Sequence, residues 1–222
     1  MRDIRKTASY FEKYLRQEHS RAQKREEQLA ACDDVEKRQR IYLSLLGYRM
    51  NILAASFSSG SDKKELTSLF NAACIAAEHA QQLSYENALI LLSFAVMLEQ
   101  TEPAKSLVQK INCAFADDKL LLYICQYIDC GKAEWRGDFL IPEIYASLDA
   151  VFAAETSAQK EKAALNYLDG WYERCKNCAW YNTLSSKFDT YTGYWSFESA
   201  AIAKILQLDI SRLKKNEYFP VL

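Results

Sequence analysis

The sequence predicts an all-α protein, a compact arrangement of about eight to ten helices. Only six Gly and three Pro occur among its 222 residues, far fewer than turn-rich β folds use. Ala, Leu, Lys, Glu and Gln recur instead, and all five are good helix formers. Half of the residues are apolar, which supplies a core and excludes a disordered chain. We expect helix pairs that can stack on one another.

The N-terminal residues predict two long helices. Residues 2–31 are mostly polar, and their sparse apolar side chains follow helical spacing, so we expect one helix that buries a single narrow stripe. Asp33, with Glu36 three residues later, gives a capping-box pattern for the second helix. Gly60 is suited to end that helix because glycine readily adopts the left-handed conformation.

Three further helices are expected before residue 115. Asp62 and Ser84 are suited to cap the third and fourth helices, and Pro103 fits the first turn of the fifth. Residues 88–98 form the most apolar run of the chain, but a run of this length is too short to span a bilayer. We therefore expect a buried core helix there and no association with a membrane.

The chain is expected to divide into an N-terminal helical half, residues 1–115, and a C-terminal helical half, residues 116–222. Residues 130–138 contain two Gly and no helical spacing, so they predict a loop. Trp135 in this loop suits either an aromatic anchor for the loop or a contact surface. Ser196 is suited to cap the last clear helix. Other helices are expected over residues 119–128, 142–154 and 157–174.

The charge is distributed unevenly along the chain. Residues 1–70 hold 14 basic and 10 acidic side chains, whereas residues 71–170 hold 7 basic and 14 acidic ones, a net charge of −7. Such an acidic region is a poor surface for nucleic acid, whose phosphates require Lys and Arg, so no direct nucleic-acid binding is expected. It is a good surface for a basic protein partner. The alternative is that these carboxylates are ordinary solvated helix faces.

No catalytic or metal-binding motif is recognised in the sequence. His19 and His79 are far apart, and neither has a partner at metal-ligand spacing; we expect a solvated His19 and a partly buried His79. Cys175 and Cys178 form a lone CxxC motif without the second pair of a zinc ribbon, which favours a structural role. Phosphate loops and the GxSxG and GxGxxG motifs do not occur. We therefore expect no enzyme, no metal and no cofactor.

The seven Cys are scattered, and their odd number does not suggest a disulfide framework. The first residues mix charges with aromatics and lack the apolar segment of a secretory signal. Both features predict reduced thiols and a cytoplasmic location.

The C-terminal segment carries the most specific pattern of the chain. Its aromatic runs are Gly170-Trp171-Tyr172, Cys178-Ala179-Trp180-Tyr181, Tyr191-Thr192-Gly193-Tyr194-Trp195-Ser196-Phe197-Glu198 and Tyr218-Phe219-Pro220. This pattern strongly resembles the C-terminal domain of the PoNi family, the immunity proteins that neutralise PoNe (polymorphic nuclease effector) DNase toxins. The N-terminal half, with Met1-Arg2-Asp3 and Tyr10-Phe11 opening a charged helix, looks like the family's other domain. Ser186 departs from the pattern, in which His often precedes the residue that corresponds to Lys187.

The resemblance implies an immunity protein whose partner is a cognate nuclease toxin of the PD-(D/E)xK superfamily, delivered between competing bacteria by a route such as type VI secretion. Such a nuclease needs a basic groove to hold DNA, and an acidic protein can block that groove. The alternative is a helical-repeat-like interaction scaffold without a dedicated toxin.

Two groups of residues are assigned on this basis. The aromatic run is expected to maintain the fold as one cluster, in which Gly193 permits a tight turn. Its members are Trp180, Tyr181, Tyr191, Gly193, Tyr194, Trp195 and Phe197. The toxin-binding face is expected in the acidic region, with Trp135 as an aromatic anchor. Its members are Asp117, Asp118, Asp129, Glu134, Trp135, Asp138 and Glu143.

Overall fold

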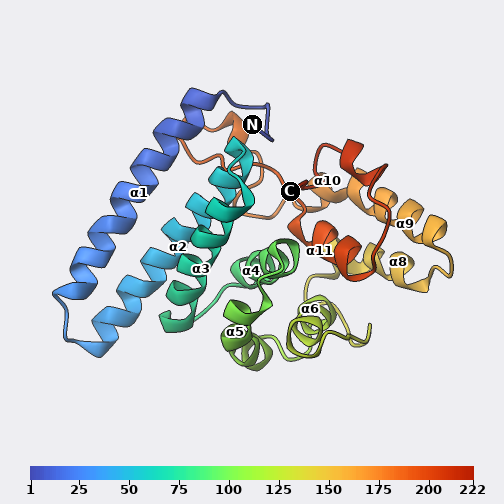
Figure 1. Ribbon diagram of the computed structural model, residues 1–222, viewed down its shortest axis with the longest axis horizontal. Coiled ribbons are helices and arrows are strands. Elements are labelled where there is room, and N and C mark those ends of the chain that lie inside the picture. Colours follow the sequence, from blue (N-terminus) through green and yellow to red (C-terminus); the bar gives the residue numbers. More distant parts are fainter. The chain divides into compact units, whose positions relative to one another are not determined.

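The computed structural model describes residues 1–222 and confirms the all-α prediction (Figure 1). The longer helices are α1 (Ala8–Ala30), α2 (Val35–Ser59), α3 (Lys63–His79), α4 (Tyr85–Leu98), α5 (Thr101–Ala114), α6 (Lys119–Cys130), α9 (Ser157–Asp169) and α11 (Phe197–Ile205). The short ones are α7 (Pro142–Tyr145), η1 (Ala146–Leu148), α8 (Asp149–Ala153), α10 (Trp171–Arg174), η2 (Thr183–Ser185) and η3 (Leu213–Lys215). No helix combines the length and apolar character that crossing a bilayer requires.

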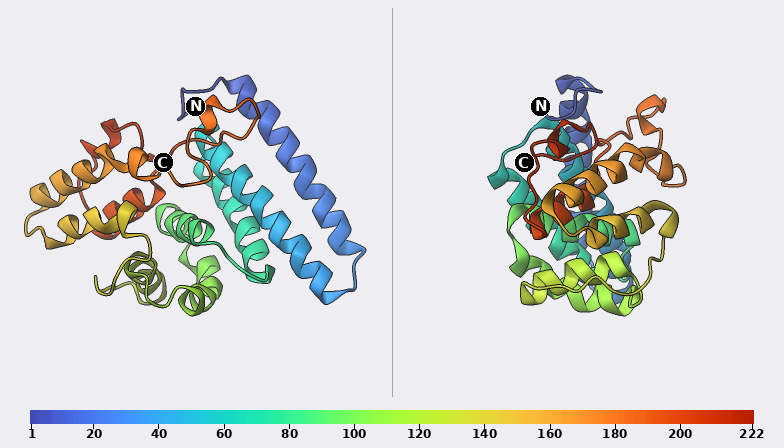
Figure 2. Two further views of the ribbon diagram at one scale, coloured as in Figure 1. Left: turned by 180° about the vertical axis from the view of Figure 1, so that it is seen from behind. Right: turned by 90° about the vertical axis from the view of Figure 1, so that its right-hand side faces the viewer.

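The chain forms two compact units. The first contains residues 1–87 and 184–193, and the second contains residues 88–183 and 194–222. In the first unit, α1, α2 and α3 lie side by side, as both Figure 1 and Figure 2 show. Their apolar stripes bury side chains such as Phe11, which makes the mostly polar α1 stable through one narrow face.

The cap residues of the first unit agree with the sequence at three places and differ at one. Asp62 caps α3, Ser84 accepts a hydrogen bond from Asn87 N at 3.2 Å, and Gly60 ends α2 with a φ of +101°. Asp34, not Asp33, caps α2, since its carboxylate accepts from Lys37 N at 2.6 Å.

The first helix starts later than predicted. Thr7 caps it by accepting a hydrogen bond from Tyr10 N at 3.2 Å, so the residues before Ala8 lie outside the helix. The amides of Arg2 and Asp3 both donate to Ser58 O at 3.0 Å, and this pairing with the end of α2 competes with helix formation.

A distant segment, residues 184–193, belongs to the first unit. The Tyr10 hydroxyl accepts a hydrogen bond from Tyr191 N at 2.9 Å and lies 3.0 Å from Tyr191 O, to which it donates. The Tyr191 hydroxyl donates to the buried Asp3 carboxylate at 2.6 Å, and Ser58 Oγ donates to Thr192 O at 2.5 Å. The first unit is therefore completed by residues from the C-terminal part of the chain.

In the second unit, the apolar α4 is buried as predicted, and the Phe94 ring lies 4.7 Å from that of Phe197 on α11. Two predicted helices are interrupted. Residues 142–154 form three short turns of helix, and residues 157–174 divide at Gly170 between α9 and α10. A Cβ at Gly170 would stand 2.4 Å from Arg174 Nη1, so the absence of a side chain at Gly170 leaves room for this guanidinium, which donates to Tyr167 O at 2.5 Å.

Candidate functional site

Helix α6 and the loop that follows it carry most of the predicted acidic face. The helix ends at Gly131, and the loop then returns along it. Near its beginning, Glu134 N donates to Gln126 Oε1 at 2.9 Å; at its end, Lys119 N donates to Asp138 O at 2.7 Å. A helix of twelve residues is about 18 Å long, at 1.5 Å per residue. The loop therefore spans the length of α6 and ends beside the start of the helix.

Asp118 joins the two ends of this arrangement. Its Oδ1 accepts from Leu121 N at 2.8 Å as the cap of α6, and its Oδ2 accepts from Leu140 N at 3.0 Å. The residue is 0% exposed. The expectation that Asp118 contributes to an exposed acidic face is therefore wrong: its buried carboxylate accepts hydrogen bonds from two backbone amides of its own unit.

Trp135 anchors the loop to the rest of the second unit. Its ring stacks on Phe152 with 3.6 Å between centroids, and its Nε1 donates to Asp149 Oδ1 at 2.7 Å. Tyr123 and Phe139 meet the same ring edge-on at 5.3 and 5.6 Å. The sequence allows Trp135 to be either an anchor for the loop or part of a contact surface, and these contacts favour the anchor.

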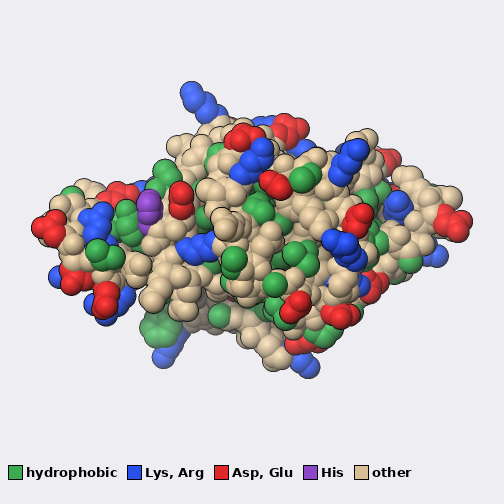
Figure 3. Space-filling model, turned by 90° about the horizontal axis from the view of Figure 1, so that it is seen from below, with side chains coloured by type: hydrophobic (Ala, Val, Ile, Leu, Met, Phe, Trp, Pro, Cys, Tyr) green, Lys and Arg blue, Asp and Glu red, His purple; other side chains and the backbone are tan.

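The remaining predicted acidic residues are all exposed: Asp117, Asp129, Glu134, Asp138 and Glu143. Asp117 and Asp138 lie on adjacent segments, because the backbone pairs at Asp118 and Asp138. Asp129 lies at the opposite end of α6. We call this set the acidic ridge. Asp117 precedes α6, Glu134 and Asp138 lie on the loop beside the helix, and Glu143 follows on α7. Glu134 Oε2 lies 3.4 Å from the exposed Arg136 Nη1. On the face that Figure 3 shows, acidic and basic side chains are interspersed.

The predicted aromatic cluster is divided in the structure. Trp180 stacks on Trp171 with 5.2 Å between centroids, and Tyr181 and Tyr194 contact Tyr172 at 4.6 and 4.8 Å. The other members lie elsewhere. Tyr191 packs near Phe11 in the first unit, and Phe197 pairs with Phe94. Gly193, with a φ of +112°, lies where the chain leaves the first unit, and Trp195 is half-buried.

Glu198, the last residue of the run that begins at Tyr191, is the centre of this C-terminal region. It is buried, and its Oε1 accepts from Tyr167 OH at 2.6 Å, Trp171 Nε1 at 2.7 Å and Ser196 Oγ at 2.7 Å. Ser196 does hold the N-cap position of α11, but its hydroxyl bonds Glu198 rather than a backbone amide. Burial raises the pKa of Glu198, with the three donors acting in the opposite direction.

This carboxyl group predicts a pH dependence of stability. A pKa raised in the folded state means that the folded protein binds a proton more tightly than the unfolded chain does. The free energy of unfolding is therefore expected to fall as the pH rises from about 4.5, the ordinary pKa of Glu, through the raised value. Urea unfolding at a series of pH values should show a flatter profile for Glu198→Gln, which cannot ionise. Parallel profiles for the two proteins would contradict this expectation.

The remaining residues singled out in the sequence are the two histidines and the two cysteines of the CxxC motif. His19 is exposed. His79 is also exposed, not partly buried, and its ring lies 4.8 Å from that of Tyr42. A hydrogen bond with the Cys178 side chain, together with burial, raises the pKa of the Cys175 thiol. No group of three or more His, Cys, Asp or Glu side chains is arranged to hold a metal ion.

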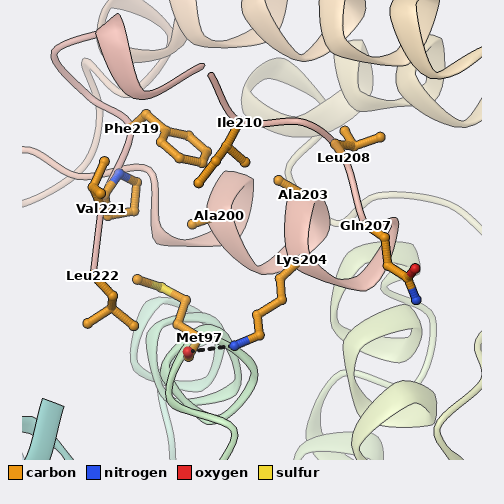
Figure 4. Close-up of a pocket in the computed structure, with 11 residues that line it drawn as sticks. Met97, Ala200, Ala203, Lys204, Gln207, Leu208, Ile210, Phe219, Val221 and Leu222 are labelled. Atoms are coloured by element: carbon orange, nitrogen blue, oxygen red, sulfur yellow. Dashed lines mark hydrogen bonds between the residues drawn. The ribbon is translucent and has the colours of Figure 1, made fainter. Parts of the chain in front are cut away.

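An apolar pocket of about 390 Å³ lies in the second unit, between Met97, α11 and the last residues of the chain (Figure 4). Lys204 is its charged group. Its Nζ donates to Met97 O at 3.0 Å and lies 3.0 Å from the Glu99 carboxylate, so its charge is already compensated.

Both halves of the chain match the same known protein family. Residues 2–109 match the N-terminal domain of the PoNe immunity proteins (PoNi), and residues 116–221 match the C-terminal domain of the same proteins. The chain belongs to the PoNi family. Membership supports an immunity protein for PoNe toxins, and a toxin protein as its partner. A family of this kind suggests a non-enzymatic role.

Among solved structures, the PoNi chain is similar to the crystal structure of protein PA2201 from Pseudomonas aeruginosa, with a TM-score of 0.66. The sequence identity is 18%, over 83% of this chain and 73% of that one, and at this level the likeness shows the fold alone. No curated protein matches the chain.

Proposed function

We propose that this protein binds and inhibits a cognate antibacterial DNase toxin in the cytoplasm, and that the acidic ridge blocks the DNA-binding groove of that toxin. Membership of the PoNi family carries the proposal. The ridge supplies a mechanism, because exposed carboxylates along about 18 Å of helix can occupy positions that phosphates would take in a basic groove. We expect a type VI secretion system to deliver this toxin.

The direct test is a plasmid-cleavage assay with the nuclease encoded beside this gene. We expect cleavage to stop at one equivalent of the immunity protein, and the two proteins to elute together in size-exclusion chromatography. Undiminished cleavage without a complex would reject this pairing and favour the interaction scaffold.

The acidic ridge can be tested by charge reversal. We expect Glu134→Lys with Asp138→Lys to weaken toxin binding by about tenfold or more in titration calorimetry, because both carboxylates are exposed on the ridge. The double variant Glu12→Lys with Glu36→Lys is a matched control, since it changes the net charge equally at exposed positions of α1 and α2. Equal weakening in both double variants would assign the effect to net charge, and unchanged affinity would remove the loop from the interface.

A further inference from the structure

We propose that Leu140 is the apolar anchor of the acidic ridge, and that it enters an apolar recess surrounded by Lys and Arg on the nuclease. This inference rests on the proposed function, because it takes the ridge as the face that meets the toxin. Leu140 is 52% exposed, although it is a large apolar residue. It lies between Asp138 and Glu143, which are both exposed.

Two hydrogen bonds hold the backbone at Leu140 and just before it. Its amide donates to the buried Asp118 carboxylate at 3.0 Å, and two residues earlier Asp138 O accepts from Lys119 N at 2.7 Å. Gly137 has a φ of +98°, and a Cβ there would lie 3.8 Å from Asp117 O, so the loop passes close to the residues before α6. A side chain presented by a fixed backbone loses little conformational freedom on binding, and this favours affinity.

The surroundings of Leu140 distinguish it from the other exposed apolar residues of the second unit. Those residues are Ile210, Val221 and Leu222, and all three line the pocket of Figure 4. The charge of that pocket, on Lys204, is compensated by Glu99. Leu140 instead lies in a segment that also carries the exposed Asp138, two residues before it, and the exposed Glu143, three residues after it.

An apolar residue within a polar rim is the arrangement that concentrates binding energy, because the rim excludes water from the central contact. The carboxylates around Leu140 determine the chemistry of the partner. A surface that receives them must be basic at its margin, and the recess for the Leu140 side chain must be apolar. The basic groove of a nuclease, with an apolar recess in its wall, meets both conditions.

The test measures toxin affinity for Leu140→Ala, Leu140→Met and the control Ile75→Ala. Ile75 lies on α3 in the first unit and is 58% exposed, so the control removes a similar apolar group. We expect Leu140→Ala to lose about tenfold to a hundredfold in affinity, Leu140→Met to stay near the wild type, and Ile75→Ala to have no effect. Circular dichroism should confirm that each variant folds.

Measurement of toxin affinity at low and high ionic strength distinguishes the contribution of the Leu140 side chain from that of the ridge carboxylates. The loss caused by Leu140→Ala should persist at high ionic strength, whereas the loss caused by Glu134→Lys with Asp138→Lys should shrink. Wild-type affinity for Leu140→Ala, with an intact wild-type complex, would overturn the anchor and leave the proposed function standing. Absence of any wild-type complex would overturn both.

Discussion

Glu198→Ala should lower the free energy of unfolding by about 4 kcal/mol, which is the largest effect that we expect from any single substitution. The change removes the common acceptor of three buried donors, on Tyr167, Trp171 and Ser196. Each donor left without a partner costs about 1–3 kcal/mol. The lost side chain also leaves a cavity. Removal of the carboxylate also removes the free-energy cost of burying its charge. The expected net loss in the free energy of unfolding is therefore smaller than the sum of these separate costs.

Urea unfolding followed by Trp fluorescence would measure this loss. Glu198→Gln keeps an acceptor oxygen and should cost less than half as much as Glu198→Ala. Glu173→Ala is the matched control, because Glu173 is exposed on the neighbouring α10 and should change stability by no more than about 0.5 kcal/mol. A loss below about 1 kcal/mol for Glu198→Ala would show that the three donors find other partners.

The helices could be predicted because local signals specify them. Apolar spacing, together with caps such as Asp62 and Ser84, depends on neighbours within four residues. The errors are of two kinds. Asp33 and Asp34 are chemically equivalent caps, and a shift of one residue cannot be resolved from the pattern. The break between α9 and α10 at Gly170 is of the other kind, because a glycine inside a helical pattern can either continue the helix or end it.

The candidate site was predictable only in part, because burial of a charged side chain depends on distant partners. Asp118 accepts from Leu140, 22 residues away, and Glu198 accepts from Trp171 and Tyr167, at separations of 27 and 31 residues. Carboxylates are mostly exposed, so composition alone favours the wrong environment for both. Leu140 is the opposite example. Leucines are mostly buried, but the loop holds this one at the surface.

The second large effect is expected for Asp118→Ala, at about 3 kcal/mol. The substitution removes the cap of α6 and leaves the amides of Leu121 and Leu140 without their acceptor. It also frees the end of the loop, since the remaining backbone contact there is the one between Lys119 N and Asp138 O. The measurements are urea unfolding and amide hydrogen exchange, in which the Leu140 amide should lose protection beyond the global change.

Asp117→Ala is the matched control for this change. Asp117 is adjacent in sequence, equally charged and exposed, so its removal should alter stability by no more than about 0.5 kcal/mol. If Asp118→Ala resembled Asp117→Ala in both measurements, the buried carboxylate would not be what fixes the loop. If Asp118→Ala also weakened toxin binding while Asp118→Asn largely preserved it, the loss would follow from the displaced Leu140 and Asp138. Asp118 itself, being buried, cannot contact the toxin in this conformation.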